Sequence, residues 1–415
     1  MRILLRAHKN PFRVASAFRT LSGDLIGGNV GNLVFSQAVC RLLSTSESQI
    51  DTSKLRGLSP NQVNAKYDQV VIPLANAFRP SFADELAELT NLIACLDIPV
   101  VVVGCGVQAP LSGQVAPSSL DETVAGFVSV VLEHSATIGV RGEITAAYLK
   151  RLGFGDDAVD VVGCPSMFMY GPQLSLTQTG RGITRESRVS LNVSPYRPEM
   201  AAVCLDHADR YPNLVYTAQD RTTLELMITG EWDSRVRRPP GSLTSLEHPL
   251  FRQNRVRFCL DPTTWMEHLR SFEFSFGTRI HGNITALLAG VPAVVLAHDS
   301  RTLELAQYHQ IPHRALSRDH ANMDAVELFS HADWTQTVSG HAERWSRMAT
   351  FLERNGLRHI DQPGQALGGF DDRLGRTHFP TPIQVGGTWL SRREATLRRW
   401  MKATLARTDH TTEEG

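Results

Sequence analysis

The sequence predicts an α/β protein of two similar halves, each built on a parallel sheet, which face each other across a cleft and precede a helical tail. At 415 residues, the chain exceeds the roughly 250–300 residues over which one hydrophobic core can grow. Short apolar runs alternate with helical patterns, which is typical of parallel strands joined by right-handed crossovers. A polar stretch, Gly171–Arg188, interrupts this alternation, which then restarts.

The first half, residues 1–175, shows the alternation most clearly. Asp68–Leu74 and Ile98–Gly104 predict buried strands, because both are apolar, rich in Val and Ile, and bounded by polar residues or glycine. Phe82–Leu96, between them, has helical spacing. Further strands are predicted at Ile3–Leu5, Thr137–Val140 and Val159–Val162, with the end of a helix at Tyr148–Leu152.

The second half, residues 188–332, repeats this architecture without repeating the sequence. Its strands are again short apolar segments, and helical patterns separate them. The predicted strands are Val189–Val193, Leu214–Ala218, Val256–Leu260, Phe272–Phe276 and Ala293–Ala297, and the predicted helices include Thr222–Thr229 and Ile284–Ala289.

The tail, residues 333–415, has a different character. Asp333–Leu357 predicts one long amphipathic helix, and Gln362–Gly387 is rich in Gly and Pro and is predicted to be irregular. Trp389–Leu405 predicts a basic helix. This basic helix is either a solvated surface or a peripheral contact with anionic lipid head groups or a lipid diphosphate.

The composition excludes several classes of function. Lys+Arg and Asp+Glu number 42 each, so no global field attracts nucleic acid, and we expect no nucleic-acid partner. The six cysteines form no Cys-x-x-Cys pair and no metal-ligand spacing, so we expect no metal site and a reducing cytoplasm. No apolar stretch approaches the ~18–20 residues of a membrane span, and no signal peptide is evident. We expect a cytoplasmic protein, peripheral at the inner face of the membrane if its substrate is lipid-linked.

The segment Gly277–Asp299 carries the clearest chemical signal. It places Arg279 and His281 between the predicted strand Phe272–Phe276 and the following helix, at the strand edge where open α/β sheets bind ligands. A helix N-terminus and a guanidinium both favour an anion, and an imidazole can donate a proton near neutral pH. The alternative is a structural arginine bonded to loop carbonyls and a histidine that caps its own helix.

The run Gly277–Pro292 resembles the hallmark motif of the polysaccharide pyruvyl transferases, R-x-H-(small)-x-x-x-A-L-x-x-G-x-P. Three further segments are similar to family motifs in the same order. They are the glycine and asparagine loop Gly27–Asn32, the helix start in Gly139–Leu152, and Val161–Ser166, which stands where the family has Gly-Asp-Pro-Ala or a relative of it.

The resemblance implies a glycosyltransferase-B-like fold of two facing Rossmann-type domains, with phosphoenolpyruvate as co-substrate and no bound cofactor. It implies that Arg141 and Arg279 hold the carboxylate and phosphate of phosphoenolpyruvate, and that His281 is the general acid. His281 would protonate the methylene carbon, after which two hydroxyls of a sugar acceptor, lipid-linked or not, would form a ketal. Other expected substrate-binding residues are Gly28, Asn29, Asn32, Gln108, Asp299 and Arg301.

Some residues depart from the family pattern. Cys164 stands where an aspartate is frequent, Asn192 replaces an arginine, and the apparent insertion His8–Ile26 is a candidate wall of the acceptor site.

Gly104–Ala109 fits a loose dinucleotide-binding pattern, but Pro110 prevents the helix that must follow, so a tight turn beside the cleft is predicted. Two alternatives stay open: a nucleotide-sugar glycosyltransferase of the same architecture, and a non-catalytic glycan-binding relative.

Overall fold

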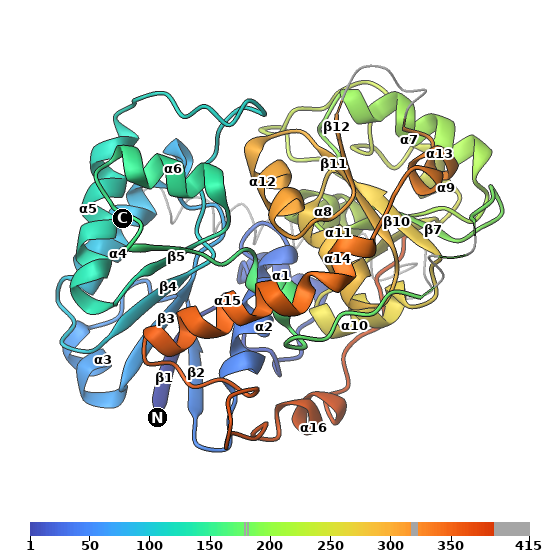
Figure 1. Ribbon diagram of the computed structural model, residues 1–415. Helices are drawn as coiled ribbons and strands as arrows, with labels where there is room; N and C mark the ends of the chain where they lie inside the picture. Colours follow the sequence, from blue (N-terminus) through green and yellow to red (C-terminus); the bar gives the residue numbers. More distant parts are fainter. Residues whose placement is uncertain (178–179, 181, 317–322, 386–415) are drawn as a thin grey trace.

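The computed structural model describes residues 1–177, 180, 182–316 and 323–385. Two α/β domains lie side by side, each around a parallel sheet (Figure 1). The basic helix predicted at Trp389–Leu405 lies outside the described residues.

The N-terminal sheet has the strand order β2-β1-β3-β4, and all its strands are parallel. A parallel bridge between Cys105 and Val140 attaches a further pair, β5 and β6. The resulting order is 2-1-3-4-5-6, and its first five strands have the order of flavodoxin-like sheets. The strands are β1 (Arg2–Arg6), β2 (Gln49–Ser53), β3 (Gln69–Pro73), β4 (Val100–Val103), β5 (Ile138–Val140) and β6 (Val159–Val161).

Helices cover the N-terminal sheet because each presents one apolar stripe to it. In α4, for example, Leu86, Leu89 and Ile93 are buried, whereas its acidic residues stay at the surface. The helices of this part are α1 (Ala17–Ser22), α2 (Gly31–Leu43), α3 (Pro60–Lys66), α4 (Ala83–Ile93), α5 (Leu120–His134) and α6 (Glu143–Arg151), with the short 3-10 helices η1 (Pro80–Phe82) and η2 (Pro165–Phe168).

The C-terminal sheet has the order β12-β11-β10-β7-β8-β9 and is also parallel throughout. Counted within this domain, the order is 3-2-1-4-5-6, the Rossmann arrangement. The strands are β7 (Val189–Leu191), β8 (Val215–Ala218), β9 (Val256–Phe258), β10 (Phe274–Gly277), β11 (Ala293–Ala297) and β12 (His313–Ala315). The helices are α7 (Glu199–Arg210), α8 (Arg221–Thr229), α9 (Pro249–Arg252), α10 (Pro262–Leu269), α11 (Ile280–Leu288), α12 (Ser300–Tyr308) and α13 (Ala325–Ser330).

The predicted strands are all present, with ends shifted by a few residues. Two strands, β2 and β12, were not predicted. Both are edge strands in which no residue is buried, so they carry none of the apolar signal from which buried strands are recognised.

The tail differs from the prediction of one long helix. Two helices, α14 (Thr335–Ser339) and α15 (His341–Arg354), meet at Gly340. A glycine weakens a helix interior, and the side chain of Arg344 occupies the space beside Gly340 that a Cβ would need. The last described helix is α16 (Phe370–Gly375).

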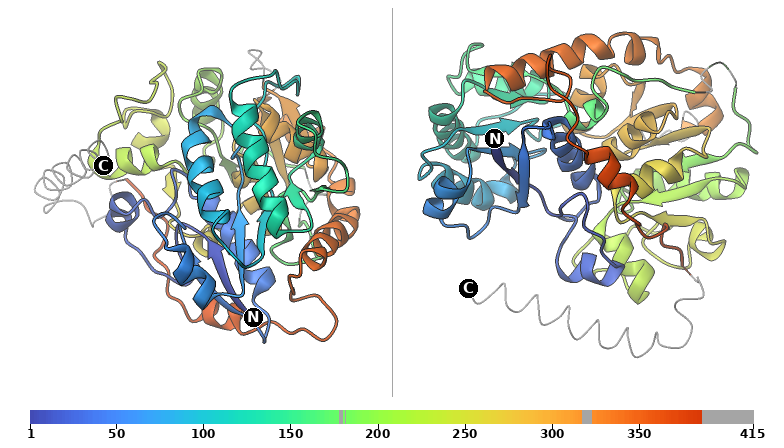
Figure 2. Two further views of the ribbon diagram at one scale, coloured as in Figure 1. Left: turned by 90° about the vertical axis from the view of Figure 1, so that its left-hand side faces the viewer. Right: turned by 90° about the horizontal axis from the view of Figure 1, so that it is seen from below.

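Helix α15 returns to the N-terminal domain and runs along one side of both domains (Figure 2). Its side chains Trp345, Met348 and Phe351 are buried in one core with Ile3 and Val71 of the N-terminal sheet. The end of the chain thus packs against its beginning.

Helix α2 contributes to both domains. Val34 and Ala38, in its first half, belong to the core of the C-terminal domain, whereas Val39 and Leu43 belong to the core that α15 shares with the N-terminal sheet. The N-terminus of α2 therefore lies between the two sheets. Within the described ranges, no helix has the length and apolar character needed to cross a bilayer.

Candidate functional site

A cavity of about 140 Å³ lies between the two domains. It is located where the carboxyl ends of the parallel strands of both sheets meet, the position at which open α/β sheets bind ligands. The lining residues from the N-terminal half are Asn29, Asn32, Phe35, Ala75, Asn76, Gly104, Arg141 and Cys164, and those from the C-terminal half are Gln219, Thr278, Arg279, Ile280, His281, His298, Arg301, Thr302 and Leu305.

The turn between β10 and α11 places Arg279 and His281 at this cavity. Gly277 has φ +149°, and a Cβ on it would lie 1.9 Å from the carbonyl oxygen of Asn192, so only glycine fits. The same carbonyl accepts a hydrogen bond from the amide of Arg279 at 3.2 Å. The side chain of Asn192 donates to Asn283 at 2.8 Å. Asn192, which replaces an arginine of the family pattern, therefore fixes this turn.

His281 is surrounded by uncharged groups and by arginines. Its Nε2 is 3.7 Å from Sγ of Cys164, and its ring meets the edge of Phe35 with a centroid distance of 6.1 Å. Burial, followed by the charges of Arg279, Arg141 and Arg301, lowers the pKa of His281 to about 4. The imidazole is therefore neutral near pH 7 in the ligand-free protein.

Glycine at the start of α2 allows the two domains to meet at this histidine. A Cβ on Gly31 would lie 2.7 Å from Cβ of His281. The glycine loop Gly27–Asn32 thus packs against His281, and it also contributes to the cavity wall.

Arg279 forms an ion pair with Asp220, which precedes α8. It also donates a hydrogen bond to the Tyr196 hydroxyl at 3.3 Å. Asp220 accepts a further hydrogen bond from the amide of Asn29 at 3.3 Å, which ties the glycine loop to the C-terminal domain. Sequence reasoning missed Asp220, although its place between a strand and a helix is the signal that identified Arg279.

Arg141 forms an interdomain ion pair with Glu304 of α12, at 2.9 Å, and both side chains are almost completely buried. Glu304 also accepts a hydrogen bond from the amide of Thr145 at 2.7 Å. A Cβ on Gly106 would lie 1.9 Å from Nε of Arg141, and one on Gly142 would lie 2.3 Å from Glu304. Gly106, one of the glycines in the loose dinucleotide-binding pattern, and Gly142 are therefore needed to make room for this ion pair.

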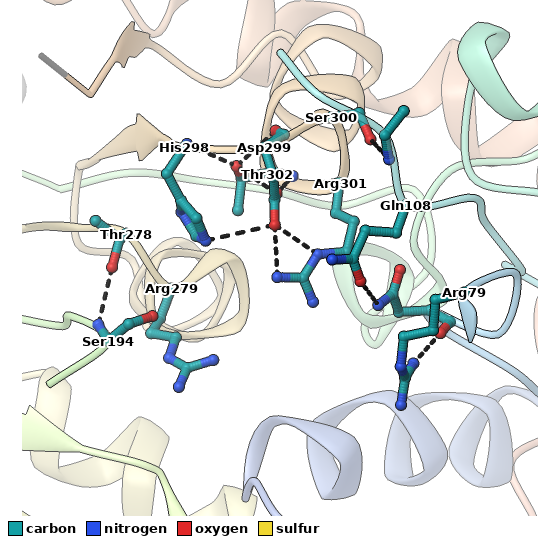
Figure 3. Close-up of polar contacts among 12 residues, drawn as sticks. Arg79, Gln108, Ser194, Thr278, Arg279, His298, Asp299, Ser300, Arg301 and Thr302 are labelled. Atoms are coloured by element: carbon teal, nitrogen blue, oxygen red, sulfur yellow. Dashed lines mark hydrogen bonds and ion pairs between the residues drawn. The ribbon is translucent and has the colours of Figure 1, made fainter. Parts of the chain in front are cut away.

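Asp299 and Arg301 form a third ion pair, at 2.6 Å. Asp299 also caps α12 through the amide of Thr302 and lies 3.4 Å from Nε2 of His298 (Figure 3). Although burial alone would raise it, Arg301 and His298 lower the pKa of Asp299 to about 2. Asp299 therefore holds Arg301 in place. The side chain that faces Nε2 of His281 is that of Cys164.

Of the other residues predicted to bind substrate, Asn29 and Asn32 line the cavity, whereas Gly28, Gln108 and Asp299 do not. The amide of Asn29 accepts from Gly31, and that of Asn32 donates to the carbonyls of Ile26 and Gly27, so both amides shape the glycine loop while lining the cavity. Gly28 and Gln108 are exposed and lie outside its lining. Gln108 contacts Asn76 at 3.1 Å. Asn76, which follows β3, also lines the cavity and was not foreseen.

A model of the family described as polysaccharide pyruvyl transferase matches residues 52–300, a range that includes Arg141, Arg279 and His281. A comparison with curated proteins gave no match. Among solved structures, the UDP-GlcNAc 2-epimerase of Methanocaldococcus jannaschii in complex with UDP-GlcNAc and UDP is 11% identical, with a TM-score of 0.48 over 85% of this chain and 99% of that chain. The Neisseria meningitidis enzyme bound to UDP-GlcNAc is 10% identical, with a TM-score of 0.46 over 86% of this chain and 100% of that chain.

Proposed function

The chain belongs to the polysaccharide pyruvyl transferase family, and we propose that it transfers a pyruvyl group from phosphoenolpyruvate to two hydroxyls of one sugar, as a ketal. The observation that carries this proposal is the convergence of His281 with Arg141, Arg279 and Arg301 in one interdomain cavity. Guanidinium groups suit the carboxylate and phosphate of the donor, and the imidazole suits the proton transfer that starts the reaction.

The proposed reaction begins with protonation. The imidazolium of His281 gives a proton to the methylene carbon of phosphoenolpyruvate, which makes the neighbouring carbon electrophilic. One sugar hydroxyl adds to that carbon, and a second displaces the phosphate and closes the ketal. Of the two hydroxyl protons, one returns to His281 and the other leaves with inorganic phosphate. The reaction therefore balances without an oxidant or a bound cofactor.

The donor itself supplies the charge that His281 needs. In the ligand-free protein, burial and three arginines lower the pKa of His281 to about 4. A bound phosphate and carboxylate bring opposite charge to contact distance and so favour the imidazolium. In this scheme, His281 becomes an acid only when the donor is present.

We place the sugar acceptor in a larger cavity of about 850 Å³, which lies at the carboxyl ends of β1 and β2. The segment His8–Ile26 contributes His8 and Asp24 to its wall, and a Cβ on Gly27 of the glycine loop would strike the ring of His8. This wall carries both signs of charge, from Arg6, Lys54, Arg56, Asp84, Glu85 and Glu88. Charges of both signs and an open volume suit a neutral polyhydroxylated ligand, such as the repeating unit of a cell-surface polysaccharide or a glycolipid. With a lipid-linked acceptor, the protein would work at the inner face of the membrane.

The test is incubation with phosphoenolpyruvate and a panel of synthetic or lipid-linked glycosides. We expect release of inorganic phosphate together with a product that carries the added pyruvyl mass. Binding of a nucleotide sugar, without acceptor-dependent phosphate release from phosphoenolpyruvate, would overturn the proposal.

A further inference from the structure

The arginines that line the interdomain cavity are already neutralised. Arg141 pairs with Glu304, Arg279 with Asp220, and Arg301 with Asp299. A salt-bridged guanidinium keeps donors for a ligand, but its net charge is compensated. An anionic donor is bound more strongly by a cationic side chain whose charge no carboxylate compensates.

Arg79 is an arginine of this region that lacks such a partner. Over the ranges that the structure describes, no carboxylate lies within 4 Å of its guanidinium. It donates to the Ser81 hydroxyl at 3.0 Å and to the backbone carbonyl of Asn76, and it stacks on Phe82 at 5.0 Å. Neutral groups therefore hold this cation in position without cancelling its charge.

Arg79 lies beside two of the cavity arginines. One terminal atom of the Asn76 amide is 3.4 Å from Nη2 of Arg141. The other is 3.2 Å from Nη1 of Arg79 and 3.3 Å from Nη1 of Arg301. Three guanidinium groups thus converge on one side chain. In Figure 3, Arg301 and Arg79 lie on either side of Gln108, which contacts Asn76. They meet just after β3, at the switch point of the N-terminal sheet.

The electrostatics favour an anion at this point. Burial, and then the charge of Arg301, lower the pKa of Arg79, with a smaller effect of Arg141. Glu85 acts in the opposite direction, but it is paired with Arg6. A partly buried cation among like charges is unfavourable until an anion binds there.

We propose that Arg79, together with Arg301 and the Asn76 amide, binds the phosphate group of the donor. This inference rests on the proposed function and extends it, because it separates the phosphate subsite, at the Asn76 cluster, from the carboxylate subsite, at Arg279. The Asn76 amide lies between these guanidinium groups, so a tetrahedral dianion bound beside it replaces their mutual repulsion by charge-assisted hydrogen bonds.

The unpaired state of Arg79 makes the inference testable apart from folding. Arg79→Gln removes a charge that no carboxylate needs, so its thermal midpoint should equal or exceed that of the parent protein. Arg79→Lys keeps the charge but loses the fork, and should restore part of the binding. Arg2→Gln is the matched control, because Arg2 is half exposed and pairs with Asp68 at the protein surface.

The experiment is calorimetric titration of inorganic phosphate and of phosphoenolpyruvate into the full-length protein and these three variants. We expect Arg79→Gln to weaken both ligands roughly 10- to 100-fold, the loss of a charged hydrogen bond, and Arg2→Gln to bind normally. Unchanged affinity in Arg79→Gln, or no binding of either ligand to the parent protein at millimolar concentration, overturns the inference. Arg79-dependent binding without pyruvyl transfer supports the phosphate site and refutes the proposed function. Pyruvyl transfer by Arg79→Gln with an unchanged KM for phosphoenolpyruvate supports the proposed function and refutes the phosphate site.

Discussion

Sγ of Cys164 lies 3.7 Å from Nε2 of His281, so the imidazole that we assign as proton donor faces a thiol. Burial raises the pKa of Cys164 to about 11, and the thiol therefore remains uncharged. Among the residues that the structure describes, the charges that act on the pKa of His281 are those of Arg279, Arg141 and Arg301, all of them positive. Its charge state depends on what enters the cavity.

A carboxylate in place of this thiol should change the pH dependence of the reaction. In Cys164→Asp, an opposite charge at contact distance should raise the pKa of His281 by roughly 1–3. An acid works while it is protonated, so the descending limb of kcat/KM should move to higher pH. Cys164→Ser, which adds no charge, should leave that limb in place. An active Cys164→Asp enzyme with the parent profile would contradict the assignment of His281.

His281→Ala tests the acid directly. Loss of a positioned proton donor should lower kcat by roughly 10²–10⁴, while the thermal midpoint stays close to that of the parent. Because the donor is expected to charge His281, phosphoenolpyruvate binding near pH 6.5 should take up more protons in the parent protein than in His281→Ala. Calorimetry in buffers of different ionisation enthalpy measures this difference. Equal proton uptake in both proteins would contradict the proposal that bound phosphoenolpyruvate favours the protonated form of His281.

The ion pair between Arg141 and Glu304 should behave as a structural unit. Both side chains are buried, with 4% and 2% of their surface exposed. Arg141→Leu leaves a buried carboxylate without a partner and should cost roughly 3–5 kcal/mol of unfolding free energy. Arg141→Leu/Glu304→Leu should recover much of this loss, as a denaturant-based double-mutant cycle would show. Additive losses would mean that the two side chains act independently.

Stability should fall on mild acidification. Burial is the leading cause that lowers the pKa values of His248, His268, His281, His298 and His341 to about 4. In the unfolded chain these histidines titrate near 6.5. Between about pH 6.5 and pH 4 the unfolded state therefore binds more protons, and stability decreases as the pH falls.

Thermal unfolding across this pH range measures the effect. Each such histidine contributes up to about 1.4 kcal/mol per pH unit. His268→Gln, which lies away from the cavity, should make the profile less steep. A midpoint that is constant from pH 7 to pH 4.5 would show that these imidazoles can be protonated in the folded protein.

Much of the fold and part of the site followed from local patterns. The buried strands were recognisable because parallel strands covered on both faces are continuous apolar runs of β-branched residues. Arg279 and His281 could be placed because the carboxyl end of such a strand is a ligand-binding edge in any open α/β sheet. The exposed edge strands β2 and β12 gave no signal, because their residues face water.

The sequence by itself determined the two-domain α/β architecture and the strand–helix junction that carries Arg279 and His281, since both depend on neighbouring residues along the chain. The tertiary structure alone decided the partners: Asp220 with Arg279, Glu304 with Arg141, and Asn76 among three arginines. The contacts of Arg279 with Asp220, of Arg141 with Glu304 and of Arg141 with Asn76 join residues 59, 163 and 65 positions apart, and the second of them crosses the domain interface. These contacts depend on how strands and helices that are far apart in the chain pack together, and no local periodicity of the sequence records that packing.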